Sequence, residues 1–130
     1  MPDAVTLRSW SLEELLGELR RRRWTLLRWG SPVNPELLAA IAERHGCADV
    51  VILRAEEDAT GYRATSWGAS SVLTPRTVSY QYHATAVWTL RAMLALPSPG
   101  AEGAPMAVET PHPRCSVPDC LPPPIVIRPL

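Results

Sequence analysis

The sequence predicts an α+β (or α/β) domain of two layers, in which helices pack on a small mixed β-sheet. Two segments, 11–19 and 84–96, show helical spacing of apolar residues, and short runs rich in Val, Ile, Trp and Tyr lie between them. A further segment, 34–46, carries helix-capping residues at both ends and is flanked by strand-like runs. This strand, helix, strand order predicts a β-α-β unit within the sheet.

The first helix is expected to begin after Ser11. Ser11 can act as the N-cap and Glu14 stands three positions later, which is the pattern of a capping box. The apolar residues that follow repeat at i, i+3, i+4 and i+7, as on one face of an amphipathic helix: Leu12, Leu15, Leu16 and Leu19. A strand is expected next, over residues 23–29, because Trp and Thr favour extended backbone.

A second helix is expected over residues 34–46. Asn34 can serve as its N-cap, and Pro35 has no N–H to lose at the first helical position. Gly46 can take the left-handed conformation that ends a helix. This helix would pack on the sheet through Leu37, Leu38 and Ile41 and connect two parallel strands, the second at 49–54.

The chain then predicts three more elements. Residues 60–65 can return antiparallel to 50–53, and residues 77–83 alternate between Val or Tyr and polar side chains, as in a strand with one solvated face. Residues 84–96 predict a helix that is apolar nearly all round, so that more than one of its sides must be buried. A small domain would bury such a helix most readily against a second subunit.

The composition changes after residue 96. Ten of the fourteen prolines fall within residues 97–130, which predicts an extended arm over 97–124. Residues 125–128 are expected to form a short strand that docks on the edge of the sheet. The predicted organisation is therefore one core domain, 1–96, and a Pro-rich arm, 97–130.

Bulk properties narrow the classes of function. The 130 residues fit one domain, and the formal net charge of zero gives no overall attraction to nucleic acid or anionic membrane. All thirteen basic residues are Arg, a bias typical of a GC-rich bacterial genome. No apolar run is long enough to span a membrane, and residues 1–3 do not resemble the start of a signal peptide. The protein is therefore expected in the cytoplasm, where its cysteines would be thiols.

Three Trp or Met side chains are candidate contacts to a protein partner. Trp67 lies in a Gly/Ser-rich stretch, where burial in the core is least expected, and Trp88 and Met93 lie on the apolar 84–96 helix. Trp is enriched at binding hot spots, although it is also common in cores.

A basic stretch offers the alternative of nucleic-acid binding. Guanidinium groups could hold phosphates while an indole stacks on a base. The residues are Arg20, Arg21, Arg22, Arg23 and Trp24. Four consecutive helical residues spread around the axis, however, so the arginines cannot all line one face.

A metal site is a second possibility, in the arm. His112, Cys115 and Cys120 could supply three ligands to zinc, with Cys47 or His45 as the fourth. The alternatives are incidental thiols or, in an oxidising compartment, a disulfide between Cys115 and Cys120.

No catalytic signature is present in the sequence. It contains no nucleophile elbow, Walker loop or dinucleotide fingerprint, and although His83 or His45 could act as a general base, structural histidines are commoner. The sequence therefore favours a non-catalytic interaction or regulatory module without a cofactor. We expect it to form a homodimer or to bind another protein, with nucleic-acid binding as the alternative.

Overall fold

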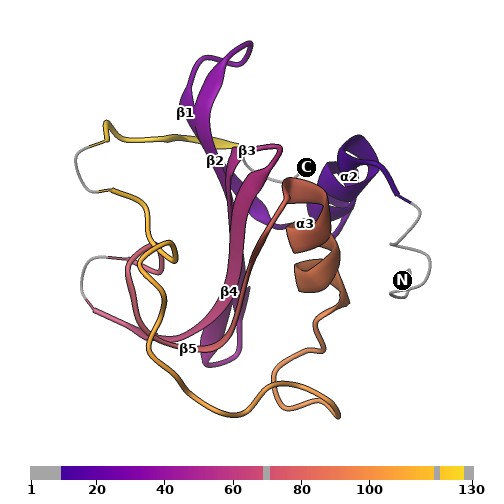
Figure 1. Cartoon of the computed structure of the whole chain (residues 1–130), viewed down its shortest axis with the longest axis vertical. Coiled ribbons are helices and arrows are strands. Elements are labelled where there is room, and N and C mark those ends of the chain that lie inside the picture. The colour runs from indigo at the N-terminus through magenta and orange to yellow at the C-terminus, as the bar shows by residue number, and fades with distance from the viewer. Residues whose placement is uncertain (1–9, 69–70, 119–120, 128–130) are drawn as a thin grey trace.

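The computed structural model describes residues 10–68, 71–118 and 121–127, which form an α+β fold. Six strands make one sheet in the order β5-β4-β3-β2-β1-β6, and every neighbouring pair is antiparallel (Figure 1). The elements along the chain are α2 (Leu12–Arg21), β1 (Thr25–Gly30), β2 (Pro35–Arg44), β3 (Cys47–Ala55), β4 (Asp58–Trp67), β5 (Pro75–Ala84), α3 (Ala86–Ala95) and β6 (Ile125–Ile127).

The prediction of a helix over residues 34–46 is wrong. This segment forms the strand β2, so the β-α-β unit is absent from the described chain and the sheet is antiparallel rather than mixed. Alternate residues of β2 face two different cores, with Ala40 and Ala42 on one side and Leu37 and Ala39 on the other. Because both faces of the strand are covered, its sequence lacks the apolar–polar alternation that would have revealed it.

Of the residues that resembled helix caps, Gly46 lies in a β-turn, whereas Asn34 precedes β2 and Pro35 begins it. Gly46 sits in the two-residue turn between Arg44 and Cys47, the last pair of the β2–β3 ladder, with a φ of +80°. Gly30 ends β1 with a φ of +95°, and a Cβ there would lie 2.7 Å from the Glu36 backbone nitrogen. Glycine is required at this turn by both the left-handed backbone and the close approach of the next strand.

The first helix is confirmed together with its capping box. The Ser11 hydroxyl accepts a hydrogen bond from the Glu14 backbone N–H, and the Glu14 carboxylate accepts one from the Ser11 N–H. Leu15 and Leu19 are fully buried on the inner face of α2.

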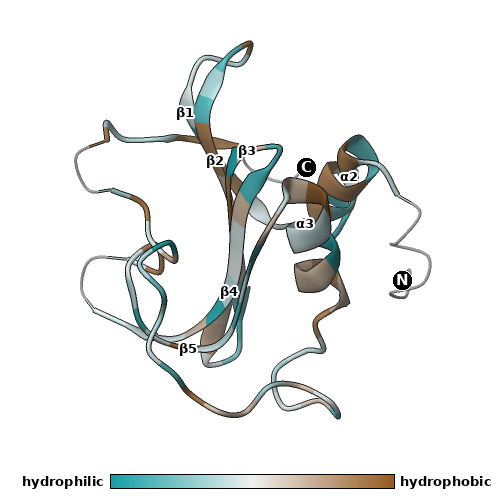
Figure 2. Cartoon of the chain, in the orientation of Figure 1, coloured by the Kyte–Doolittle hydropathy of each residue, from teal (hydrophilic) through white to brown (hydrophobic). Residues whose placement is uncertain are grey.

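The sheet separates two apolar cores. On one face, α2 and α3 pack on the sheet. The core between these layers includes Trp24, Val51 and, from α3 itself, Leu90 and Met93. On the other face, the chain after α3 covers Val50, Ile52 and Tyr62. Figure 2 shows hydrophobic residues along α2, along α3 and on strands of the sheet. Both faces of β3 are therefore buried, which explains its continuous apolar run.

The segment after α3 runs across the second face of the sheet to its far edge (Figure 1). Glu109 pairs with Val78 at the outer edge of β5 through two backbone hydrogen bonds. Cys115 and Val117 are buried in the core below, and the Val117 N–H donates to the Leu73 carbonyl. The chain then forms β6, which pairs with Leu26–Arg28 of β1.

Candidate functional site

The helical layer is narrower than the sheet. Helix α3 packs on β3, β4 and β5, and α2 packs against α3. The helix-side face of β1 and β2 is therefore less completely covered, and it carries the half-buried side chains of Leu26 and Leu38. A groove lies at this place, between α2 and the strands.

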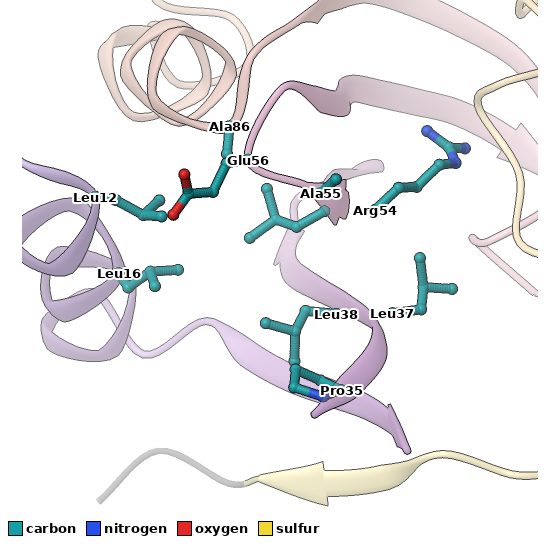
Figure 3. A pocket seen from close by; sticks show the side chains of 10 residues that line it. Leu12, Leu16, Pro35, Leu37, Leu38, Arg54, Ala55, Glu56 and Ala86 are labelled. Carbon is teal, nitrogen blue, oxygen red and sulfur yellow. The ribbon is translucent and has the colours of Figure 1, made fainter. Parts of the chain in front are cut away.

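Two adjoining hollows, which we call the α2 groove, make up this site. The larger holds about 220 Å³ and the smaller about 100 Å³, and both are lined by Leu16, Leu38 and Leu53. Figure 3 shows Leu12 and Leu16 on the α2 wall, opposite Leu38 and Pro35. At the smaller hollow, Ala40 of β2 has its short side chain on the helix side of the sheet and leaves the space unfilled.

The two ends of the α2 groove carry opposite charges. Glu56 lines the larger hollow, with its carboxylate directed toward Leu12 (Figure 3). Arg20 lines the smaller hollow and is exposed. Across residues 10–68, 71–118 and 121–127, neither side chain forms an ion pair. As far as the described residues are concerned, both charges are therefore available to a bound molecule.

Arg54 also lines the larger hollow, but its charge is directed elsewhere. Its guanidinium points away from the cavity in Figure 3 and donates to the Thr60 hydroxyl and to the backbone carbonyls of Arg114 and Ser116. Burial, followed by the charge of Arg114, lowers the pKa of Arg54. This side chain ties the arm to the sheet instead of serving the groove.

A polar cluster fixes the arm over the opposite face. Gln81 Oε1 accepts hydrogen bonds from the His112 N–H, at 2.9 Å, and from the Cys115 thiol, at 3.4 Å. The His112 and His83 rings lie 5.0 Å apart between centroids. His83 Nδ1 lies 3.2 Å from the Thr60 hydroxyl. Burial, then the proximity of His112, Arg114 and Arg54, lowers the pKa of His83, so its neutral form is favoured.

Cys115 is a buried thiol and a poor nucleophile. Burial raises its pKa to about 11, so the thiolate is scarce at neutral pH. Cys47 is also buried, and burial raises its pKa. Both are free thiols.

The predicted metal site does not assemble in the described part of the chain. Cys120 lies outside the described residues, so neither its role as a ligand nor a disulfide to Cys115 can be placed. His112 and Cys115 share the partner Gln81, but no group of three His, Cys, Asp or Glu among the described residues could hold a metal ion.

The three predicted partner contacts have different environments. Trp88 is 54% exposed on α3, beside the Arg91 guanidinium. Trp67 is 38% exposed at the end of β4 and borders a separate hollow of about 390 Å³ with Cys47 and Val72. Met93 is buried against Gly61 of β4, so it has no surface to offer a partner.

The basic stretch is divided by the fold. Arg20, Arg21 and Arg23 are exposed, but Arg21 and Arg22 both donate to the Glu18 carboxylate at 2.8 Å. Arg22 also donates to the Leu94 carbonyl of α3. Trp24 is 1% exposed, so its indole cannot stack on a base. The residues do not form one surface that combines cations with an aromatic ring.

Sequence reasoning missed the leucines of the α2 groove. Leu12 and Leu16 belong to the predicted apolar stripe, but a stripe does not reveal which of its members stay half-buried. Leu38 was assigned to a helix that does not exist. That Arg20 forms no ion pair within the described residues is visible only in the structure, so the sequence offered no signal for the groove.

The comparisons with known proteins identify no relative: no family model, no curated protein and no solved structure matches the chain. Among the described residues, no helix is long and apolar enough to cross a membrane. The fold and site therefore define the protein only as a small α+β domain with an antiparallel sheet and a groove beside α2.

Proposed function

We propose that the protein is a small, cytoplasmic, non-catalytic interaction module that associates with a second copy of itself through β6. The single observation that carries this proposal is the exposed apolar edge formed by β6. Ile125 is 53% exposed and Val126 is 45% exposed, although they are adjacent residues of a β-strand.

The two edges of the sheet differ in a way that supports this surface. At the β5 edge, the Val78 N–H and carbonyl are already paired with Glu109 of the arm. At the other edge, β6 pairs only with β1 within the described chain. An unpaired strand edge with apolar side chains is a template for another strand. Two copies of β6 would pair isologously around a two-fold axis.

The alternative of nucleic-acid binding has weaker support. Its aromatic member, Trp24, is buried, and two of its arginines share the Glu18 carboxylate. Catalysis by His83 has weak support as well, because the hydroxyl beside it belongs to Thr60, which is 0% exposed, and the buried Cys115 thiol has a pKa of about 11.

Analytical ultracentrifugation of the full chain tests the proposal. The wild type is expected to sediment as a concentration-dependent dimer. A double change, Ile125→Lys and Val126→Lys, should give a folded monomer, because lysines on an edge strand oppose pairing. Val33→Lys is the matched control: Val33 is 95% exposed in the β1–β2 turn, away from β6. Heparin chromatography of the same samples tests the nucleic-acid alternative.

Two results would contradict self-association through β6. One is a wild-type chain that remains monomeric at high concentration. The other is a dimer that the lysine pair leaves intact, which would move the interface to another surface such as Trp88.

A further inference from the structure

We propose that the α2 groove is a binding site for a free medium-chain aliphatic carboxylate, with the carboxylate at Arg20 and the hydrocarbon chain directed toward Leu12. The assignment does not depend on whether the protein forms a dimer.

The shape of the groove fits a narrow chain. Leu12, Leu16 and Arg20 are spaced at i, i+4 and i+8, so they lie along one face of α2. The rise of an α-helix places Leu12 and Arg20 about 12 Å apart along the axis. An extended decanoate molecule has a comparable length. The combined space of the two hollows lies near the lower end of the ~300–1,000 Å³ typical of small-ligand pockets.

The walls provide the apolar contacts that such a chain requires. Leu16, Leu38 and Leu53 line both hollows and are only half-buried. Ala40 lines the smaller hollow without filling it. A hydrocarbon chain in this place would remove the exposed parts of these leucines from water.

The charges determine the class of the head group and its orientation. Arg20 lines the smaller hollow, and its guanidinium forms no ion pair with an acidic side chain of the described chain. Guanidinium groups bind carboxylates through charge-assisted hydrogen bonds. The Glu56 carboxylate at the opposite end would repel an anionic head group placed there. These charges place the head of an anionic ligand at Arg20 and keep it away from Glu56.

Isothermal titration calorimetry with decanoate, decanol and decylamine tests this assignment. Wild-type protein should bind decanoate more tightly than decanol, and binding of decylamine, whose ammonium would pair with Glu56 instead, should not depend on Arg20. Arg20→Gln should weaken decanoate binding about tenfold, because it removes a hydrogen bond to a charged group, and should leave decanol binding unchanged. The matched control is Arg23→Gln, an exposed arginine of the same stretch that does not line the groove.

A second variant tests the apolar part of the groove. Leu16→Trp should fill the space beside α2 and weaken decanoate and decanol alike. Circular dichroism and thermal melting would establish that this variant and Arg20→Gln remain folded.

Four results would overturn the assignment. They are the absence of decanoate binding to folded wild type, equal affinity for decanoate and decanol, equal effects of the Arg20 and Arg23 changes, and binding to anionic phospholipid vesicles without binding of decanoate. Sedimentation tests a further occupant: a dimer that Leu16→Trp dissociates, in a wild type that does not bind decanoate, would assign the groove to a second copy instead.

Discussion

At the scale of single residues, the least expected feature of the core is a buried ion pair. Asp49 and Arg63 are cross-strand neighbours on β3 and β4, and they are 0% and 2% exposed. The Asp49 carboxylate accepts from Arg63 Nε at 2.6 Å and from Arg63 Nη2 at 3.0 Å. Arg44 Nε adds a third hydrogen bond at 3.2 Å. The Asp49 carboxylate therefore has its hydrogen-bond partners, and each of the two buried charges needs the other to compensate for its loss of hydration.

Removal of one partner should be far more damaging than removal of both. Asp49→Asn leaves the Arg63 charge buried without compensation, and we expect a loss of about 3–5 kcal/mol in the free energy of unfolding. The double variant Asp49→Leu, Arg63→Met should recover much of that loss, because apolar side chains of similar volume tolerate burial. Urea denaturation measures both values. A loss below about 1 kcal/mol for Asp49→Asn, the range of an exposed pair, would contradict the buried interaction.

Gly61 allows α3 to approach the sheet closely. A Cβ at Gly61 would lie 2.5 Å from Met93 Cγ and 2.8 Å from Met93 Sδ. Because Met93 is buried, we expect Gly61→Ala to destabilise the fold by about 1–3 kcal/mol, the usual cost of overpacking. Gly17→Ala is the control, since its Cβ meets only Arg21 Nη1 at 3.7 Å and Ala favours a helix. Thermal melts that rank the two variants in the opposite order would contradict this packing.

At the scale of elements, β6 pairs with β1, which would otherwise be the edge strand of the sheet. It covers Leu26–Arg28 of β1 with three residues only, and it follows Pro122–Pro124. The strand is short and half-exposed, yet it is the last one at that edge.

Truncation after Pro124 should lower both the melting temperature and the solubility of the protein. The truncated chain would leave β1 as an unpaired apolar edge, and such edges promote aggregation. Differential scanning fluorimetry and light scattering at increasing concentration measure the two effects. Equal melting temperature and solubility for the truncated and full chains would show that residues 125–130 are a passive tail.

At the scale of the whole molecule, acid should weaken the fold through His83. Burial and the nearby His112, Arg114 and Arg54 lower its pKa below the ordinary 6.5, so the unfolded chain binds this proton more readily than the folded chain. The stability contributed by the neutral ring is complete above pH 6.5 and is lost as the pH falls toward the lower pKa of the folded state. His83→Gln should flatten this part of the profile.

Urea denaturation between pH 7.5 and 5 would measure the profile in both proteins. His45→Gln is a suitable control, because His45 is exposed in the β2–β3 turn. A wild-type stability that rises as the pH falls through this window would contradict the inferred direction.

The sequence by itself determined the local features whose signals lie within a few residues. The capping box of Ser11 and Glu14 and the helical spacing that follows place α2, and residues 77–83 lie within β5 as predicted. The prediction that Val78 and Tyr80 share one face of that strand is wrong, because they pack into different cores where the β4–β5 register shifts. The α+β class follows from these elements. None of these signals depends on a distant partner, which is why they could be predicted.

Only the tertiary structure decided whether residues 34–46 form a helix or a strand, and where the α2 groove lies. Asn34, Pro35 and Gly46 suit the end of a helix and a β-turn equally well, and helix propensity is a weak preference that tertiary packing can override. Side chains of β2 pack into a core on each face of the sheet, so burial favours a strand over a helix here. For the same reason the sequence of β2 shows no apolar–polar alternation. The groove exists because α2 rests on α3 and leaves β1 and β2 partly open, an arrangement set by contacts between distant segments.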